Sequence, residues 1–485
     1  MVSLSALLSV CGYATPLSPD LSIGSIVQHS SKAEEGSLFF AIDGEHTSGR
    51  LWAAEAVARG AVAVVSEHPI DHLPVPVFVM PRVRSVYAHM CAAFYADPQD
   101  HLCVIGVTGT DGKSTTCDYL HHILTDNGLR CGLLSTISID DGSSKRASPY
   151  RQSTPEADQL FAFLSRAVDH GLTHVILECT SHALSTLFDR LGPIKFDVAI
   201  ATTVSSEHLD FHHTRDAYLD AKLNIVRRLK ADGLFVSSTE NPALPAFLSL
   251  LRRRENAVVV GEDLPFSTTP KGWEGVTIES GGERVTTPLL LPVLATNALV
   301  ALAAARHLTR KAIALAQLGH LPAPKGRMEV VPNSAGITVV IDFAHTADSY
   351  EKLFGTIESI GSIGHLTVVM GAAGRRDRTK RAAMGRIAAS AADLLIITEE
   401  DPRDESEEQI ADDLLSEVDR RRTTILQIPK RRSAIRTAIE RAEAGDVVLL
   451  LGKGHERSIQ RKNETIAWDE RAVARRALAK KEQGR

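Results

Sequence analysis

The feature that most limits the possible folds is a repeated order of apolar segment, polar loop and helical pattern along most of the chain. The apolar segments are rich in Val, Ile and Leu and end in glycines or charged residues; they lie at 101–109, 173–178, 195–204, 233–238, 337–345, 365–374, 393–402 and 446–456. Strands that alternate with helices in this way build mostly parallel sheets covered by helices. Ligands of such sheets bind at the carboxyl ends of the strands. The sequence therefore predicts an α/β protein whose chemistry lies at those ends.

Length and two turn-rich joints predict three domains. A chain of 485 residues is too long for one ordinary core, and a hydrophobic fraction of 44% suits packed globular domains. The stretches YADPQDHL at 95–102 and GHLPAPKGRM at 319–328 interrupt the pattern with proline, glycine or both. We expect an N-terminal domain over 1–98, a central domain over 99–322 and a C-terminal domain over 323–485.

Charge, cysteine usage and hydropathy exclude several classes of protein. The 54 basic residues nearly balance 59 acidic ones, for a net charge of -5, so a nucleic-acid partner is not indicated. The six cysteines form no CxxC pair, which is typical of reduced thiols in a cytoplasmic protein. No apolar run approaches the roughly 20 residues that span a bilayer. The apolar start LSALLSVCGYA has no Lys or Arg before it, so we expect neither membrane insertion nor a signal peptide.

The stretch GVTGTDGKST at 106–115 predicts a nucleotide site. It joins a buried strand to a helix through glycines, which let backbone N–H groups turn toward a phosphate at the positive helix end. Lys113 can reach the outer phosphates, and the hydroxyl of Ser114 can bind Mg²⁺. The strict pattern GxxxxGK[ST] is not met, because Val107 stands where its first glycine belongs. The alternative is an ordinary turn between strand and helix.

Two further segments carry candidate metal ligands. Glu178 ends the apolar run 173–178, a usual place for a carboxylate that completes a Mg²⁺ site; alternatively, it begins a surface loop. The segment 205–226 contains several histidines, among them His208, ahead of a helix with Lys222. Its spacing lacks the partners typical of zinc sites, so zinc is a minor alternative. Taken alone, Lys222 is most simply a solvated helix lysine.

The order of the short motifs resembles the Mur ligases, most closely their MurE-type branch. The motifs are GTDGKST, ECTSHAL, EHLDFH with AYLDAK, GRMEVV, IDFAHTADSYEKL, EDPR and GKGHE, preceded by GSLFFAIDGEHTSGR and AVARGAVAVVSE. The resemblance covers nearly the whole chain. It implies an N-terminal UDP-sugar-binding α/β domain, a central ATPase-like domain with a phosphate loop, and a C-terminal Rossmann-like domain that binds the amino acid.

The resemblance also implies a reaction. The branch adds a diamino acid to UDP-N-acetylmuramoyl-L-alanyl-D-glutamate in peptidoglycan precursor synthesis. ATP phosphorylates a carboxylate, the amine attacks the acyl phosphate, and ADP and phosphate leave. This chemistry is reasonable because phosphate makes a leaving group of a carboxylate oxygen, while magnesium and lysine neutralise the crowded anions. We expect ATP and Mg²⁺ as cofactors and a monomeric enzyme.

Site residues follow by matching motifs. The implied catalytic residues are Lys113, Glu178, His208, Lys222 and Arg327, with Arg327 as a clamp on the γ-phosphate. Metal ligands would be Ser114, Glu178, His208 and Lys222, the last as a carbamate, which turns an ammonium into an anionic ligand. The implied ATP-binding residues are Gly109, Thr110, Asp111, Gly112, Lys113, Ser114, Thr115, Asn297, Arg327, Asp342 and His345.

The implied sugar-nucleotide residues include two departures from the family pattern. The set is Ser31, Ser153, Thr154, Ser181 and Arg190. Where the family has Asp-Ser-Arg, this chain has Ser30, Ser31 and Lys32, and Arg190 stands two residues later than usual. We therefore expect a remodelled loop at that end of the substrate site.

The implied amino-acid residues leave the identity of the amine open. They are Arg376, Asp401, Arg403, Gly452 and Glu456. Relatives that add meso-diaminopimelate carry Asp-Asn-Pro-Arg, and here Asp401 replaces the asparagine. Arg403 keeps a guanidinium that can hold a distal carboxylate. Asp401 either neutralises Arg403 in part or binds a terminal ammonium, so L-lysine and L-ornithine stay open beside the slightly favoured diaminopimelate.

Two rival interpretations remain. One is a related amide ligase, of the folylpolyglutamate synthase or cyanophycin synthetase type; GKGHE and the N-terminal motifs argue against it. The other is a nucleotide-binding relative without catalysis, which the departures at 30–32 and at Asp401 suggest. Against it, the chain retains Lys113, Glu178, His208 and Lys222.

Overall fold

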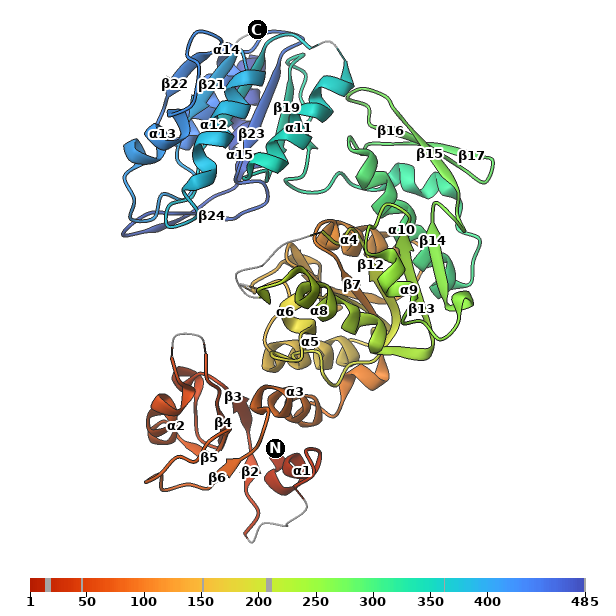
Figure 1. Cartoon of the computed structure of the whole chain (residues 1–485), viewed down its shortest axis with the longest axis vertical. Helices are drawn as coiled ribbons and strands as arrows, with labels where there is room; N and C mark the ends of the chain where they lie inside the picture. The colour runs from red at the N-terminus through yellow and green to blue at the C-terminus, as the bar shows by residue number, and fades with distance from the viewer. Residues whose placement is uncertain (14–18, 45–46, 151, 206–211, 362, 484–485) are drawn as a thin grey trace. The chain divides into compact units, whose positions relative to one another are not determined.

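The computed structural model describes residues 1–13, 19–44, 47–150, 152–205, 212–361 and 363–483 (Figure 1). The chain divides into two compact units. The first comprises Met1–Phe266, Ser280–Glu283 and Thr296–Gln317, and the second Ser267–Glu279, Arg284–Ala295 and Leu318–Arg485. The division into three domains at 98 and 322 stays a prediction.

The first unit begins with a small parallel sheet. Its order is β3-β4-β5-β6, from Ser25–Val27, Ser37–Ala41, Ala61–Ser66 and Val77–Val79. In β4, Leu38 and Phe40 enter one apolar cluster while Phe39 and Ala41 enter another, because successive side chains of a strand point to opposite faces. The accompanying elements are β1 (Val2–Ser3), α1 (Leu4–Ser9), β2 (Ser22–Ile23), η1 (Ser30–Lys32), η2 (Gly49–Trp52), α2 (Ala53–Ala58) and α3 (Val83–Phe94).

A larger, mostly parallel sheet forms the rest of this unit. Its order is β10-β9-β8-β11-β7-β12-β13-β14, and the six strands from β8 to β14 in this order run parallel. The strands are β7 (Cys103–Thr108), β8 (Cys131–Leu134), β9 (Ser138–Asp140), β10 (Arg146–Ala147), β11 (His174–Glu178), β12 (Phe196–Ala201), β13 (Leu229–Ser238) and β14 (Ala257–Val260). Because β7 lies between β11 and β12, the loops after these three strands meet at one sheet edge.

Helices and 3₁₀ turns accompany this sheet. They are η3 (Pro98–His101), α4 (Lys113–Asp126), α5 (Ala157–Asp169), α6 (Ser181–Leu184), α8 (Arg215–Arg227), α9 (Leu244–Leu248), η4 (Arg254–Asn256), α10 (Pro292–Thr309) and η5 (Leu315–His320). The first residues of α10 and the last residues of η5 belong to the second unit. Within the described ranges, no helix is both long enough and apolar enough to cross a membrane.

The second unit has a doubly covered sheet of order β18-β19-β23-β20-β21-β22. All its strands are parallel except β18. They are Glu329–Val330, Thr338–Asp342, Val447–Leu451, Leu366–Met370, Leu394–Ile397 and Thr424–Gln427. Side chains of α11 (Ala347–Ile360), α12 (Thr379–Ala391) and α13 (Glu407–Leu415) pack on one face. Those of α14 (Arg431–Arg441) and α15 (Glu470–Gln483) pack on the other.

Smaller strands complete this unit. The hairpin β24–β25 (Ser458–Gln460 and Thr465–Ala467) follows β23, and β15, β16 and β17 (Phe266–Pro270, Val276–Ser280 and Glu283–Thr287) form a three-stranded sheet. The predicted α/β class with mostly parallel sheets is confirmed. Each sheet places a set of polar loops at the carboxyl ends of its strands.

Candidate active site

The glycine loop after β7 has no room for side chains at two positions. Gly109 and Gly112 have φ values of 152° and 80°, which favour glycine. A Cβ at Gly109 would lie 1.8 Å from Oγ1 of Thr202, and one at Gly112 would lie 2.8 Å from Nδ2 of Asn297. The predicted strand, turn and helix are therefore present, and Asn297 lies against the start of α4.

Side chains from neighbouring strands and helices hold this loop. Thr202, just after β12, donates to the carbonyl oxygens of Thr108 (3.1 Å) and Asp111 (2.5 Å). The hydroxyls of Thr110 and Tyr218 lie 2.9 Å apart in a hydrogen bond. Sequence analysis missed Thr202 and Tyr218, since only the sheet order brings them to the loop. Thr115 is buried in the first turn of α4.

Two lysines converge on one carbonyl of the loop. Lys113 Nζ donates to the carbonyl oxygens of Gly109 (3.0 Å) and Thr110 (2.7 Å). Lys222 Nζ, from α8, donates to the same Gly109 oxygen at 2.6 Å and lies 4.6 Å from the ring centroid of Tyr218. Lys222 is 1% exposed, so it is not the solvated lysine that its helical position alone suggests. The structure thus brings two lysine side chains to the Gly109 carbonyl oxygen.

Glu178 and Ser114 form a pair that suits a magnesium ion. Glu178 is buried at the end of β11, and its Oε2 accepts from Ser114 Oγ at 2.9 Å and from the backbone N–H of Thr136 at 2.8 Å. Adjacent oxygen ligands of an octahedral Mg²⁺, each about 2.1 Å from the ion, lie about 3.0 Å apart. Both donors are oxygens, which Mg²⁺ prefers. Glu178 therefore does not begin a surface loop, and the pair fits the ion.

His208, the third predicted metal ligand, lies outside the described residues. Among those that are described, no group of three or more His, Cys, Asp or Glu side chains is arranged to hold a metal ion.

Two predicted sugar-nucleotide residues lie beside Glu178. Thr154 Oγ1 donates to the carbonyl oxygen of Glu178 at 2.7 Å and accepts from Thr180 N at 3.0 Å. Ser153 Oγ accepts from Thr136 Oγ1 at 2.7 Å. Thr136 is a residue that sequence analysis missed; its signal is its place just after β8, next to β11 in the sheet.

The other predicted sugar-nucleotide residues lie in different surroundings. Ser181, the first residue of α6, is buried, and its Oγ lies 3.0 Å from Nε2 of His212. Arg190 is also buried; it forms an ion pair with Glu156 and donates to the Thr154 carbonyl at 3.2 Å. Ser31 lies in η1, beside the small N-terminal sheet, and is exposed.

In the second unit, three predicted nucleotide residues gather after β19. The carboxylate of Asp342 accepts from the N–H groups of Met328 and Ala344, both at 2.7 Å. Burial raises the pKa of Asp342. The guanidinium of Arg327 lies 4.9 Å from the ring centroid of Phe343. Burial lowers the pKa of His345, whose Nδ1 lies 2.8 Å from the Phe343 carbonyl oxygen.

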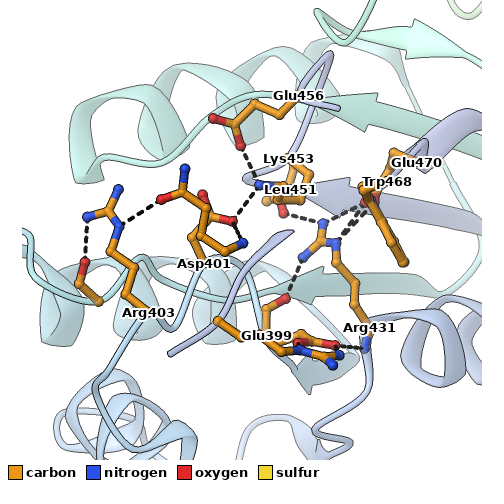
Figure 2. Close-up of polar contacts among 12 residues, drawn as sticks. Glu399, Asp401, Arg403, Arg431, Leu451, Lys453, Glu456, Trp468 and Glu470 are labelled. Atoms are coloured by element: carbon orange, nitrogen blue, oxygen red, sulfur yellow. Dashed lines mark hydrogen bonds and ion pairs between the residues drawn. The ribbon is translucent and has the colours of Figure 1, made fainter. Parts of the chain in front are cut away.

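The predicted amino-acid residues include a charged cluster after β21 and β23, shown in Figure 2. Asp401 Oδ1 accepts from Lys453 Nζ and from the N–H of Gln460, both at 2.9 Å. Lys453 Nζ also lies 2.5 Å from Glu456 Oε2. Arg403 Nη1 donates to the carbonyl oxygen of Gly374 at 2.7 Å, and Nε to Gln460 Oε1 at 3.2 Å. The charge of Asp401 is thus matched by Lys453, a residue that sequence analysis quoted within GKGHE without assigning.

The remaining two residues predicted to bind the amino acid lie in different surroundings. Arg376 is exposed in the loop after β20. Gly452, after β23, has a φ of 98°, and a Cβ there would lie 2.5 Å from Oε2 of Glu400. Gly452 therefore lets the backbone approach a buried carboxyl group.

The raised pKa of Glu400 predicts how the stability of the protein changes with pH. Its Oε2 is buried without a hydrogen-bond partner, and burial is the main cause that raises its pKa from 4.5 to about 6. The folded state therefore holds the proton more tightly than the unfolded state, and stability is lost as pH rises from 4.5 through about 6. We expect Glu400→Gln to raise the free energy of unfolding by about 2 kcal/mol at pH 7.5 and to have little effect at pH 4.5.

Urea unfolding at both pH values measures this difference. Glu358→Gln, at an exposed position of α11, is the matched control and should change stability equally little at both. An equal effect of Glu400→Gln at pH 4.5 and 7.5 would contradict the raised pKa.

Comparison with known proteins agrees with the motifs and the fold. The model of the Mur ligase middle domain matches residues 107–305, and that of the Mur ligase, glutamate ligase domain matches 326–454. A UDP-N-acetylmuramyl-tripeptide synthetase of Roseiflexus sp. (strain RS-1) is 37% identical over 96% of this chain and 96% of its own.

Two further relatives bear a more specific description. The UDP-N-acetylmuramoyl-L-alanyl-D-glutamate--2,6-diaminopimelate ligase of Geobacillus kaustophilus (strain HTA426) is 35% identical over 94% of both chains. A solved structure of a ligase with this description matches 99% of both chains at 26% identity, with a TM-score of 0.67.

The glycine loop and the Ser114–Glu178 pair, together with the similarity to tripeptide synthetases and diaminopimelate ligases over nearly the full chain, identify an ATP-dependent ligase that joins an acid to an amino acid. The chain belongs to the Mur ligase family.

Proposed function

We propose that the protein adds a diamino acid to UDP-N-acetylmuramoyl-L-alanyl-D-glutamate in the cytoplasm, acting as a monomer in peptidoglycan precursor synthesis and so in cell-wall growth, shape and division. The observation that supports the activity most is the convergence of Lys113, Lys222 and the Ser114–Glu178 pair on one glycine loop. The full-length similarity to tripeptide synthetases and diaminopimelate ligases supports the choice of substrates. The three predicted domains would hold the sugar nucleotide, ATP and the amino acid.

The first unit would hold the phosphates of ATP. Lys113 is placed to exchange its two carbonyl partners for phosphate oxygens, and the N–H groups at the start of α4 would face the same anion. Ser114 and Glu178 would hold Mg²⁺, which neutralises phosphate charge when bound. His208 and Lys222, the latter as a carbamate, are the further ligands in this proposal. Asn297, beside Gly112, would contact the adenosine end.

Other residues of the chain would orient the acyl substrate and complete the nucleotide site. Ser153, Thr154 and Ser181 lie at the Glu178 end of the sheet and would position the sugar nucleotide together with Arg190 and Ser31. In the second unit, Arg327 would act on the γ-phosphate, with Asp342 and His345 at the ribose and phosphates. The new bond needs no protein nucleophile, because phosphate activates the carboxylate.

The amino acid would bind after β20, β21 and β23 of the second unit. Arg403 would hold the distal carboxylate of meso-diaminopimelate, and Glu456 an ammonium group, beside Arg376, Asp401 and Gly452. Because Lys453 matches the charge of Asp401, the positive charge of Arg403 is not neutralised by that aspartate, although two of its N–H groups bond Gly374 and Gln460. This arrangement supports meso-diaminopimelate ahead of L-lysine and L-ornithine.

Phosphate release tests the proposal. Purified protein is given ATP, Mg²⁺ and UDP-N-acetylmuramoyl-L-alanyl-D-glutamate, with meso-diaminopimelate, L-lysine or L-ornithine in separate reactions. We expect release that depends on both substrates and is fastest with meso-diaminopimelate. Faster release with lysine or ornithine would reassign the amine, and no release with any of the three would overturn the proposed function.

A further inference from the structure

Lys453 is a buried cation shared by two carboxylates. Its side chain is 0% exposed, while those of its partners Asp401 and Glu456 are 12% and 36% exposed. Its Nζ lies 2.9 Å from Asp401 Oδ1 and 2.5 Å from Glu456 Oε2 (Figure 2). A buried lysine is stable as a cation only with such partners. Of the three charged groups, Glu456 is the one most open to a ligand.

A second network of charged side chains holds the loop that carries Asp401. Arg461 donates to both oxygens of Glu399, each at 2.9 Å. Arg431 donates to the carbonyl oxygens of Glu399 (3.3 Å) and Leu451 (2.7 Å), so one guanidinium ties the loop after β21 to the end of β23. These contacts hold the backbone two residues before Asp401 and two residues before Lys453. The fold therefore supports the position of the Asp401–Lys453 pair.

The charge balance of the cluster bears on which amines it accepts. Asp401, Glu456 and Lys453 together leave one net negative charge, which Glu456 presents; the buried carboxyl group of Glu400 also interacts with all three. A substrate ammonium at Glu456 competes with Lys453 for this carboxylate, and Asp401 draws Lys453 partly away from it. Lysine and ornithine carry a net positive charge at neutral pH, whereas diaminopimelate is neutral overall, so added negative charge favours lysine and ornithine.

We propose that Lys453 is a specificity-determining positioning residue, which pairs with Asp401 and limits the negative charge that Glu456 offers to the incoming diamino acid. The proposal rests on the proposed function of this site. It assigns a role to a residue that contacts no substrate and acts through Glu456. It also predicts that the aspartate at position 401 shifts selectivity toward lysine and ornithine, and that Lys453 counteracts this shift.

Single and double variants of Lys453 and Asp401 test the role of Lys453 in selectivity. The measured quantity is the ratio of kcat/KM for L-lysine to that for meso-diaminopimelate. Lys453→Met leaves two negative charges, and we expect the ratio to rise about tenfold. Adding Asp401→Asn removes one of these charges and returns the net charge of the cluster to one negative, as in wild type. The ratio of the double variant should therefore return to within about threefold of the wild-type ratio. Asp401→Asn alone lets Lys453 neutralise Glu456, and the ratio should fall by about threefold or more.

Controls separate this role from a structural one. Lys462→Met changes an exposed lysine in the turn of the β24–β25 hairpin and should leave the ratio as in wild type. A lysine that only supports the fold would lower kcat/KM for both amines alike, raise the KM for ATP as well, and show no rescue in the double variant; that result would overturn the inference. If Lys453→Met does not fold, an unchanged ratio in Asp401→Asn would overturn it equally.

Binding without turnover keeps this test apart from that of the proposed function. Calorimetric titration of the wild type and variants with L-lysine and meso-diaminopimelate should show the same order of preference as the kinetic ratios. If the wild type releases no phosphate with any amine, the proposed function fails. If it is active or binds the amines, and the charge variants do not change the preference, only the inference about Lys453 fails.

Discussion

Lys113→Ala is expected to lower the rate of phosphate release from ATP by about 10²- to 10³-fold, because it removes a preorganised cation from the developing phosphate charge. The fold should persist, since Lys113 is only half-buried and the loop keeps its other supports. Thr202 still holds the carbonyls of Thr108 and Asp111, and Thr110 still bonds Tyr218. The measurement is kcat with saturating substrates, together with the thermal unfolding midpoint.

Lys195→Ala is the matched control for this variant. Lys195 is an exposed lysine of the same unit, and its replacement should leave both quantities unchanged. Near-normal phosphate release by Lys113→Ala would contradict the assignment of the loop as the triphosphate site.

Arg431→Met is expected to lower the free energy of unfolding by about 3–5 kcal/mol, because it leaves Glu470 as an uncompensated buried charge. Both side chains are 0% exposed, and Arg431 Nη2 lies 2.6 Å from Glu470 Oε1. The same guanidinium also bonds the carbonyl oxygens of Glu399 and Leu451. Urea unfolding measures the loss.

Two further variants isolate the buried charge as its cause. Arg436→Met removes an exposed ion pair of the same helix and should cost less than about 1 kcal/mol. Glu470→Gln added to Arg431→Met removes the orphaned charge while keeping an acceptor for Trp468 Nε1, and it should restore most of the lost stability. A double variant no more stable than Arg431→Met would show that the charge is not the cause.

Much of the fold was predictable because it rests on local patterns. Alternating apolar strands and helices predicted the parallel sheets, and the glycine turn predicted the junction of β7 and α4. The strand order was not predictable: β23 lies between β19 and β20, which precede it in the chain by many residues. Such pairings depend on how long crossovers pack, and no short segment specifies this.

The candidate site shows the same contrast. Lys113, Ser114 and Glu178 were found from their places next to strands and glycines. Lys222 gave no signal by itself, because its burial arises only when α8 packs against the glycine loop. Lys453 was visible in GKGHE, yet its pairing with Asp401 joins residues far apart in sequence.

The sequence by itself determined the fold class, the phosphate loop and the resemblance to the Mur ligases, because each depends on residues close together in the chain. Only the tertiary structure decided which partner each charged side chain contacts: Lys222 the Gly109 carbonyl oxygen, Glu178 the Ser114 hydroxyl, and Asp401 the Lys453 ammonium. The physical reason is that a charge acts over a few ångströms in space, and strand order and helix packing set which side chains come that close.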